Sequence, residues 1–320
     1  MIERNAAADL EAFDCEVPDD GYVWWYLDAV SDDGQHGLTL IAFVGSVFSP
    51  YYARARRQGP ADPQEFCALN VALYGVSHRR WALSEYRREA VSRSAKIFRL
   101  GRSQLSRTAT GLQIRVDERC VPMGRALRGT VELETVTRFS ASRLLDSRGH
   151  HQWCVLAPFA RVSVSFDQPR LAWQGAAYLD TNRGSAPLER DLRHWTWLRT
   201  VEQGATTVLY DVVDRNGKDV MHALRFLADG SVHTPAAGPT LQATTRTGWG
   251  IRRPVRSDPE SPPGVIATLE DTPFYNRSRM RLSLGGQALE AVHESLDLDR
   301  FASRWVQVLL PFKTRRAKSR

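Results

Sequence analysis

Short strand-like runs separated by turn signals recur along almost the whole chain, and this pattern limits the fold more than any other feature. The clearest turn signals are Asp-Gly at 33–34 and 229–230 and Asn-Gly at 216–217, dipeptides that favour tight hairpin turns. Only residues 288–296 and 298–305 favour a helix. Serial strands at this spacing predict a mostly β protein, an antiparallel sandwich or barrel, and not alternating strands and helices.

The tripeptide Tyr-Leu-Asp occurs twice, at 26–28 and at 178–180, about half the chain apart, and a turn that contains glycine follows each copy. A chain of 320 residues is long enough for two domains with cores of ordinary size. We therefore expect two tandem antiparallel β-barrel domains, at 1–169 and 170–320, with the boundary at Pro169.

Composition and motifs exclude several classes of protein. No apolar run approaches the roughly 20 residues of a membrane-spanning helix, and the polar start Met1–Asn5 does not resemble a signal peptide. The sequence lacks a phosphate-binding glycine loop, and His293-Glu294 has no second histidine to complete a zinc helix. We expect no nucleotide cofactor and no metal.

The four cysteines stand far apart in the sequence, at positions 15, 67, 120 and 154. No pair has the two-residue spacing of a zinc or redox motif. This spacing predicts buried free thiols, which suit a protein of the reducing cytoplasm.

The formal net charge is +7, and arginines supply most of the positive side, in clusters at 54–57, 79–80 and 87–88 and in the tail 313–320. These clusters fit a nucleic-acid partner, an anionic membrane surface, or an arginine-rich composition with no partner. No recognition helix, zinc finger or RNA-binding signature accompanies them. The apolar run Val306–Phe312 beside the basic tail favours a membrane surface, so we expect no nucleic acid.

The stretch 173–184 contains a candidate acid. Tyr178 and Asp180 share one face of a strand, because side chains repeat every second residue, and His151 and Trp153 form a second such pair. If the two strands are neighbours, an acid, a base and two aromatic rings converge. Burial between aromatic rings keeps an aspartic acid protonated, and ring faces stabilise a cation. The pattern predicts an active site that protonates an apolar molecule, although the four residues fit a packed core and an Asp turn as well.

Long aromatic-rich blocks at 21–29, 31–34, 37–52, 68–75 and 80–85 resemble the bacterial acyclic carotenoid 1,2-hydratases, also called hydroxyneurosporene synthases. The functional residues of that family are a His-x-Trp pair and a Tyr-x-Asp pair. Here they match His151 and Trp153, then Tyr178 and Asp180. The resemblance implies a lipocalin-like fold with two β-barrels.

The resemblance also implies a reaction, the hydration of the terminal C1=C2 double bond of neurosporene or lycopene to a tertiary alcohol, without a cofactor or metal. We expect Asp180 to protonate C2, and Trp153 and Tyr178 to stabilise the cation at C1. Water then adds, and His151 or Asp180 takes its proton. Because the substrate lives in the membrane, we expect a cytoplasmic protein held peripherally at the inner, photosynthetic membrane, with an apolar barrel mouth at the bilayer.

Two other functions compete with this one. A non-catalytic lipocalin-like carrier of carotenoids or other lipids explains a barrel and an aromatic pocket equally well, and it does not require a protonated Asp180. A basic nucleic-acid-binding protein predicts binding that falls steeply with salt. The basic clusters are not interleaved with aromatic residues in one strip, so this third possibility has less support.

Overall fold

The computed structural model describes residues 12–75, 79–137, 139, 141–235 and 239–317. The polar start at Met1–Asn5 and the last three residues of the basic tail, 318–320, lie outside these ranges. The chain forms two compact units. Unit 1 consists of residues 1–144, 150–187 and 308–320, and unit 2 of residues 145–149 and 188–307.

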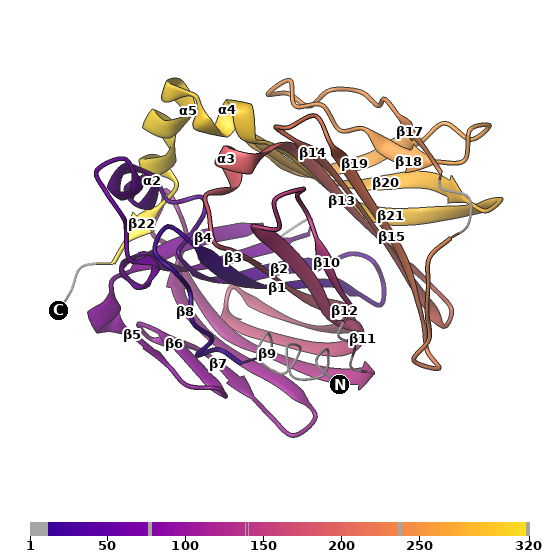
Figure 1. Ribbon diagram of the computed structural model, residues 1–320. Helices are drawn as coiled ribbons and strands as arrows, with labels where there is room; N and C mark the ends of the chain where they lie inside the picture. The colour runs from indigo at the N-terminus through magenta and orange to yellow at the C-terminus, as the bar shows by residue number, and fades with distance from the viewer. Residues whose placement is uncertain (1–11, 76–78, 138, 140, 236–238, 318–320) are drawn as a thin grey trace, which may run out of the picture. The chain divides into compact units, whose positions relative to one another are not determined.

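Unit 1 is built on one large sheet (Figure 1). Its strands are β1 (Tyr22–Ser31), β2 (Gly37–Val44), β3 (Cys67–Tyr74), β4 (Arg80–Tyr86), β5 (Val91–Arg93), β6 (Ile97–Leu100), β7 (Ser103–Arg107), β8 (Gly111–Arg119), β9 (Ala126–Thr137), β10 (Ala141–Leu144), β11 (His151–Gln168), β12 (Arg170–Gly184) and β22 (Arg315–Arg316). Their order is β22-β4-β3-β2-β1-β12-β11-β9-β8-β7-β6-β5, with β10 also beside β11. Short helices in its connections are α2 (Pro50–Arg56), η1 (Pro63–Phe66), η2 (Arg88–Ala90) and η3 (Leu310–Phe312).

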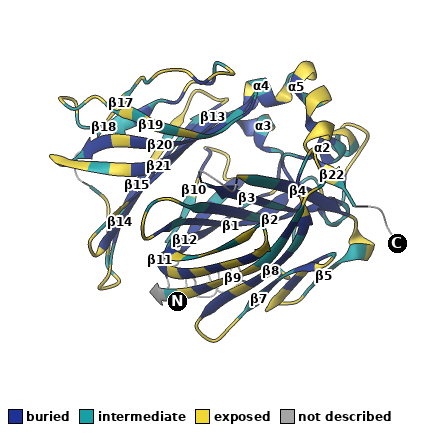
Figure 2. Ribbon diagram, turned by 180° about the vertical axis from the view of Figure 1, so that it is seen from behind, coloured by how far each residue is buried: buried dark blue, intermediate teal, exposed yellow. Residues whose placement is uncertain are grey.

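The large sheet curls around an apolar core. Figure 2 shows buried and exposed bands alternating along β8 and β9, as expected where one face of a strand packs inward. Tyr86 of β4 donates hydrogen bonds to both carboxylate oxygens of Glu118 on β8, at 2.8 and 2.9 Å, so strands distant in the sheet order meet. A cavity beside Trp25 and Leu156 of this core holds about 30 Å³.

Unit 2 carries a second antiparallel sheet, in the order β16-β15-β14-β13-β21-β20-β19, and a two-stranded sheet of β17 and β18. Its elements are α3 (Leu188–Asp191), β13 (Leu192–Glu202), β14 (Ala205–Asp214), β15 (Asp219–Leu227), β16 (Val232–His233), β17 (Thr240–Gln242), β18 (Val255–Ser257), β19 (Gly264–Asp271), β20 (Tyr275–Leu284), β21 (Gln287–Asp297) and α4 (Leu298–Ala302), and α5 (Arg304–Leu309) follows. Sheets dominate both units, which confirms the prediction of a mostly β protein. Within the described ranges, every helix is too short or too polar to cross a bilayer.

The position that we predicted as the domain boundary, Pro169, lies at the turn of a hairpin. β11 and β12 pair from Asp167 opposite Arg170 to His151 opposite Gly184, and both strands belong to unit 1. The chain passes into unit 2 after residue 187 instead. A proline beside a strand run marks this turn, where the sequence suggested a break between domains.

The two Tyr-Leu-Asp copies are neighbours in one sheet. β1 and β12 pair antiparallel, with Tyr26 opposite Asp180 and Asp28 opposite Tyr178. The repeat therefore does not mark equivalent strands of two separate barrels, as the sequence suggested. Antiparallel pairing places the Tyr and Asp of one copy against the Asp and Tyr of the other, on the same face of the sheet.

The helical predictions had two different outcomes. Residues 288–296 lie within β21, so the helix predicted there was wrong. Their Leu, Ala and Glu side chains favour a helix in isolation, but pairing with β13 on one side and β20 on the other overrides that preference. The helix predicted over 298–305 is confirmed by α4 and the start of α5.

Helix α2 lies outside 288–296 and 298–305, the two runs in which the sequence favoured a helix. Ser49 caps this helix by accepting a hydrogen bond from the Tyr52 amide at 3.1 Å, and Pro50 occupies its first position. Both features are typical of a helix start.

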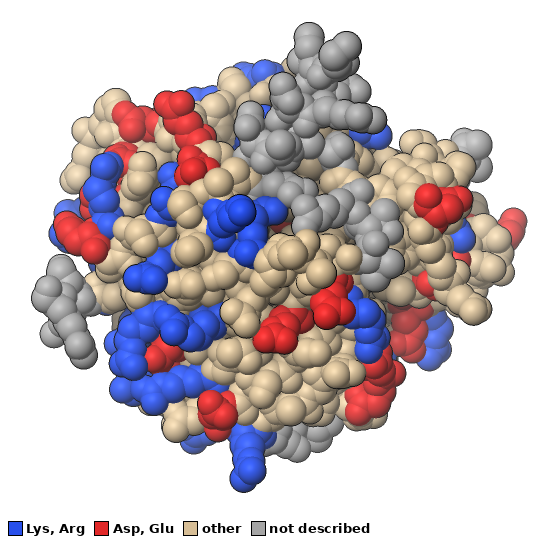
Figure 3. Space-filling model, turned by 90° about the horizontal axis from the view of Figure 1, so that it is seen from below, with Lys and Arg blue, Asp and Glu red and all other residues tan. Residues whose placement is uncertain are grey.

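Two sequence features can be compared with the structure, the cysteines and the distribution of surface charge. All four cysteines are free, with Cys67, Cys120 and Cys154 buried. On the face shown in Figure 3, acidic side chains lie among the basic ones. Exposed side chains also form ion pairs, such as Arg161 with Asp32 at 2.7 Å. Carboxylates therefore interrupt the positive charge on this face.

Candidate active site

Two neighbouring strands of unit 1, β11 and β12, carry the predicted site residues. β12 lies between β1 and β11 and pairs antiparallel with both, so the condition that the two candidate strands be neighbours is met. Asp180 lies opposite Val155, and Asn182 lies opposite Trp153. Because residues directly opposite each other share a face, Trp153, Tyr178 and Asp180 lie on one face of the sheet.

This face is the one opposite the packed core of unit 1. The alternate residues of the same strands, among them Trp25, Cys154 and Leu179, belong to that core. The site side chains therefore project away from this core. They are nevertheless buried, since Tyr178 and Trp153 have 0% exposure and Asp180 has 2%.

The Asp180 carboxyl group has two unequal oxygens. Oδ2 accepts a hydrogen bond from Trp153 Nε1 at 2.8 Å and another from the Tyr178 hydroxyl at 2.9 Å. Oδ1 faces Asn182 Nδ2 at 3.5 Å. A carboxyl oxygen that accepts two hydrogen bonds uses both of its lone pairs. A proton on Asp180 therefore belongs on Oδ1.

The two donors at Oδ2 keep their protons. An indole N–H only donates, and burial, together with the neighbouring Asp180, raises the pKa of Tyr178 well above its ordinary value. Both groups therefore stabilise the carboxylate that forms when Asp180 releases a proton, through charge-assisted hydrogen bonds. A buried carboxyl group supported in this way can act as a general acid toward an apolar molecule.

His151 lies further along the same strands. Its partner across β12 is Gly184, four residues from Asp180, a separation on the order of 13 Å along a strand. Its Nδ1 forms a 3.0 Å hydrogen bond with the Tyr22 hydroxyl, and the two rings stack. A Cβ atom on Gly184 would lie 2.4 Å from the Tyr22 ring and 2.7 Å from His151 Nδ1, so this close approach requires glycine.

Two further polar residues, Tyr22 and Asn182, lie on this face and were not predicted from the sequence. Asn182 continues the period-2 series of Tyr178 and Asp180, a signal that was present in the sequence. Tyr22 had no such signal, because its place beside His151 depends on the pairing of β1 with β12. Trp24 lies opposite Asn182 and stacks on Tyr22 at 4.8 Å.

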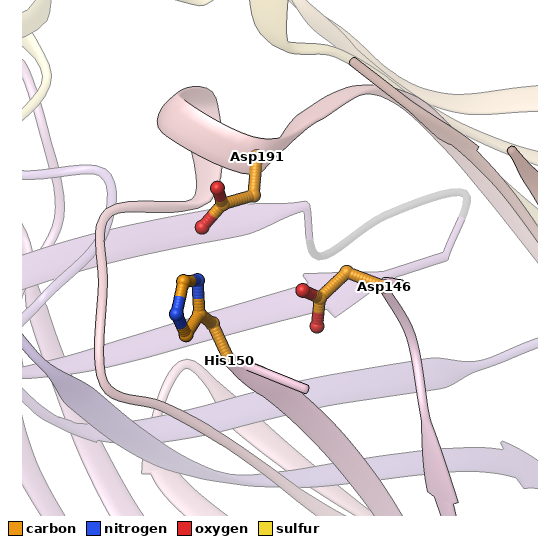
Figure 4. A group of neighbouring side chains, drawn as sticks. All are labelled: Asp146, His150 and Asp191. Atoms are coloured by element: carbon orange, nitrogen blue, oxygen red, sulfur yellow. The ribbon is translucent and has the colours of Figure 1, made fainter. Parts of the chain in front are cut away.

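Unit 2 contains two buried carboxylates, Asp146 and Asp191, which Figure 4 shows. Asp191 forms ion pairs with Arg148 at 3.1 Å and with Arg190 at 3.4 Å. The charge of Asp191 is thus balanced by arginines. These contacts hold the loop 145–149 against α3, and we assign them a structural role.

Solved structures of other proteins share this fold. A candidate AttH protein from Nitrosomonas europaea matches with a TM-score of 0.57 at 15% identity, over 86% of this chain and 92% of that protein. The structure of CghA matches with a TM-score of 0.50 at 13% identity, over 87% and 88% of the two chains. Together, the fold and the site define a lipocalin-like β protein with a buried aspartic acid among aromatic side chains.

Sequence comparison identifies the family within this class. The model of the carotenoid hydratase CrtC family matches residues 40–320. The acyclic carotenoid 1,2-hydratase of Thiocapsa roseopersicina is 44% identical over 301 residues, which cover 94% of this chain and 74% of the relative. That of Rubrivivax gelatinosus is 46% identical over 308 residues, 94% of this chain and 75% of the relative. The chain belongs to the carotenoid hydratase family, and the resemblance noted in the sequence is confirmed.

Proposed function

We propose that this protein adds water across the terminal C1=C2 double bond of an acyclic carotenoid, such as neurosporene or lycopene, to give a tertiary alcohol. The observation that carries the proposal is the Asp180 carboxyl group, buried on an aromatic face with two donors fixed at one oxygen. Membership of the carotenoid hydratase family supports the choice of substrate.

The proposed reaction begins with protonation of the alkene. Asp180 transfers the proton on Oδ1 to C2, and a tertiary cation forms at C1. The carboxylate left behind is stabilised by Trp153 Nε1 and the Tyr178 hydroxyl. The π-faces of Trp153 and Tyr178 stabilise the cation.

Water then completes the addition. Its oxygen forms a bond to C1, and one of its protons returns to the Asp180 carboxylate, so the acid is restored. Atoms and charge balance with water as the only co-reactant. His151, which the sequence offered as a second base, forms a hydrogen bond with Tyr22 instead, and we assign it the role of positioning that aromatic ring beside Trp24.

The test is turnover of emulsified lycopene and neurosporene in oxygen-18 water by the wild type and by Asp180→Asn. We expect one heavy oxygen per hydroxyl formed by the wild type. Asp180→Asn should lower turnover at least ~10³-fold, because it removes the acid and keeps the shape. Asp167→Asn, at an exposed aspartate on the same hairpin, is the matched control and should retain activity.

The result also separates the enzyme from a carrier. Tight binding of pigment by the wild type, with no heavy oxygen in the recovered carotenoid, would favour a lipid carrier. Hydration by Asp180→Asn at the wild-type rate would exclude Asp180 as the acid, whichever protein class is correct.

A membrane contact for this water-insoluble substrate is part of the proposal. In the apolar run Val306–Phe312, Val306 and Leu310 are buried, whereas Val308 and Phe312 are 66% and 72% exposed. The next residue, Lys313, lies over the Trp81 ring at 5.1 Å. The Val121 amide donates to the Trp81 carbonyl at 3.1 Å, in the turn that carries Met123, which is 73% exposed.

We name Met123, Val308, Leu309 and Phe312 the apolar patch. Lys313 and the arginines at 119, 125 and 315 lie within a few residues of its members in the sequence. Exposed apolar side chains with cations beside them suit an anionic bilayer surface, where the apolar groups enter the interface and the cations meet lipid phosphates. This arrangement supports peripheral attachment at the cytoplasmic face of the inner membrane.

A further inference from the structure

Asn182 is the polar side chain beside Asp180 to which the proposed reaction has so far given no part. It is 3% exposed. Its Nδ2 faces Asp180 Oδ1 at 3.5 Å, the oxygen that carries the proton. Among the residues that the structure describes, none donates a hydrogen bond to its Oδ1.

A buried amide oxygen without a donor costs free energy, so such groups in folded proteins usually meet water or a ligand. The amide is oriented with Nδ2 toward Asp180 Oδ1, because that oxygen keeps a lone pair that accepts from Nδ2 even when it carries the proton. The amide oxygen Oδ1 therefore points away from Asp180 and can accept a hydrogen bond from a molecule other than the described part of the chain.

The register places this acceptor between two indole side chains. Asn182 lies opposite Trp24 on β1 and opposite Trp153 on β11, and directly opposite residues share a face. Asp180 is two residues away on the same face, which corresponds to roughly 7 Å between Cα atoms. A water molecule bound at Asn182 would thus lie among aromatic faces that hold the cation and close to the acid.

We infer that Asn182 is a positioning residue that holds the water molecule attacking C1. Its Oδ1 accepts a hydrogen bond from this water, which directs the water lone pair toward the cation. The water oxygen forms the bond to C1, and the released proton passes to Asp180. This inference rests on the proposed hydration, and it concerns only the second half of that reaction.

The inference predicts a change in the fate of the cation. A cation with water in place becomes the alcohol. A cation without it loses a proton to the Asp180 carboxylate and returns to the alkene. In D₂O, Asp180 delivers deuterium to C2, so a cation that returns by losing protium leaves deuterium in the recovered carotenoid.

The experiment measures two products in D₂O for each protein, the deuterium in recovered lycopene and the alcohol formed. Asn182→Leu keeps the side-chain size and removes the acceptor. Its ratio of exchange to hydration should rise on the order of 10-fold or more over the wild type, since poor positioning of a reactant costs factors of this size. Asn182→Ser, which keeps a hydroxyl acceptor and leaves space for water, should recover part of the wild-type ratio.

Thr181→Val is the matched control. Thr181 is the next residue, is buried, and donates to the Trp24 carbonyl at 2.8 Å, but it lies on the other face of β12. Loss of its hydrogen bond should change exchange and hydration by the same factor. Thermal unfolding checks that each variant is folded.

The outcomes are distinct. An unchanged ratio in both Asn182 variants, with hydration and exchange falling together, would overturn the inference and leave the proposed function intact. A wild type that forms neither alcohol nor deuterated carotenoid would overturn the proposed function itself. A raised ratio in Asn182→Leu, restored in part by Asn182→Ser, would establish the water-positioning role.

Discussion

At the residue scale, the direction of the hydrogen bonds decides what Asp180 can do. Both short donors, from Trp153 and Tyr178, end at the same carboxyl oxygen. This leaves the other oxygen to carry the proton, on the side where Asn182 lies. Asp180 can thus carry out both proton transfers of a hydration. It first donates a proton to carbon and later accepts a proton from the water that adds.

Removing one of the two donors should slow the proton transfer without unfolding the protein. Trp153→Phe keeps an aromatic face and deletes the Nε1 donor at 2.8 Å from Asp180. A hydrogen bond to a charged group contributes about 1.5–3 kcal/mol, so we expect kcat to fall roughly 10- to 100-fold with little change in KM. Tyr178→Phe should cause a loss of similar size by the same mechanism.

Kinetics with emulsified lycopene at matched substrate loading measure these effects. Trp173→Phe is a suitable control, because Trp173 lies on the neighbouring strand β12 but packs against the core of unit 1. A Trp153→Phe enzyme with unchanged kcat would show that the indole serves only as packing.

The strand period predicted part of this site. Spacing by two residues places Tyr178 with Asp180 and His151 with Trp153, and the structure has both pairs on one face of neighbouring strands. The partner of His151 could not be predicted, because Tyr22 reaches it only through pairing across 129 residues of sequence. The sequence contains the facing direction of each side chain but not the order in which distant strands pair.

At the scale of the elements, long-range pairing explains both the correct and the incorrect predictions. Turn dipeptides and apolar runs identified strands because those signals are local. Residues 288–296 were interpreted as a helix from equally local preferences, yet two neighbouring strands hold them in β21. The repeated tripeptide was also a local signal. Whether its two copies belong to two barrels or to one sheet depends on how β1 and β12 pair, which the sequence does not contain.

The apolar patch is the element that should bind membranes. Full burial of a large apolar side chain contributes about 1.5–3 kcal/mol, so the double variant Val308→Ser with Phe312→Ser should weaken binding to phosphatidylglycerol-containing vesicles at least ~10-fold. Flotation at low ionic strength measures the bound fraction. Val201→Ser, at an apolar side chain that is 47% exposed in unit 2, should bind as the wild type does. Equal flotation of all three proteins would exclude the patch as the site of attachment.

At the scale of the whole molecule, burial shifts the pKa values of two glutamates in unit 1 and of two histidines in unit 2 in opposite directions. In unit 1, burial raises the pKa of Glu85 to about 7 and also raises the pKa of Glu118. In unit 2, burial lowers the pKa of His293 to about 3 and also lowers the pKa of His194. The unshifted pKa values are 4.5 for Glu and 6.5 for His. Burial therefore favours the neutral form of both side chains, which is the protonated form of Glu85 and the deprotonated form of His293.

These shifts predict opposite dependences of stability on pH. Folded unit 1 binds more protons than its unfolded chain between about pH 4.5 and 7, so the contribution of Glu85 is present below that window and is lost as pH rises through it. Folded unit 2 binds fewer protons between about pH 3 and 6.5, so the contribution of His293 is present above that window and is lost as pH falls. The shifts correspond to free energies of unfolding of about 3 kcal/mol for Glu85 and about 5 kcal/mol for His293.

Two substitutions separate the contributions. Glu85→Gln removes the ionisation in unit 1, and its melting temperature relative to the wild type should rise by several degrees from pH 5 to pH 8. His293→Gln retains a donor for the Pro254 carbonyl, which lies 3.0 Å from Nε2, and its relative melting temperature should rise from pH 7 to pH 4. Thermal unfolding followed by circular dichroism across pH 4 to 8 compares the three proteins. For each variant, the melting temperature relative to the wild type is plotted against pH. If both plots slope in the same direction, burial of Glu85 and His293 does not produce the opposite pH dependences predicted here.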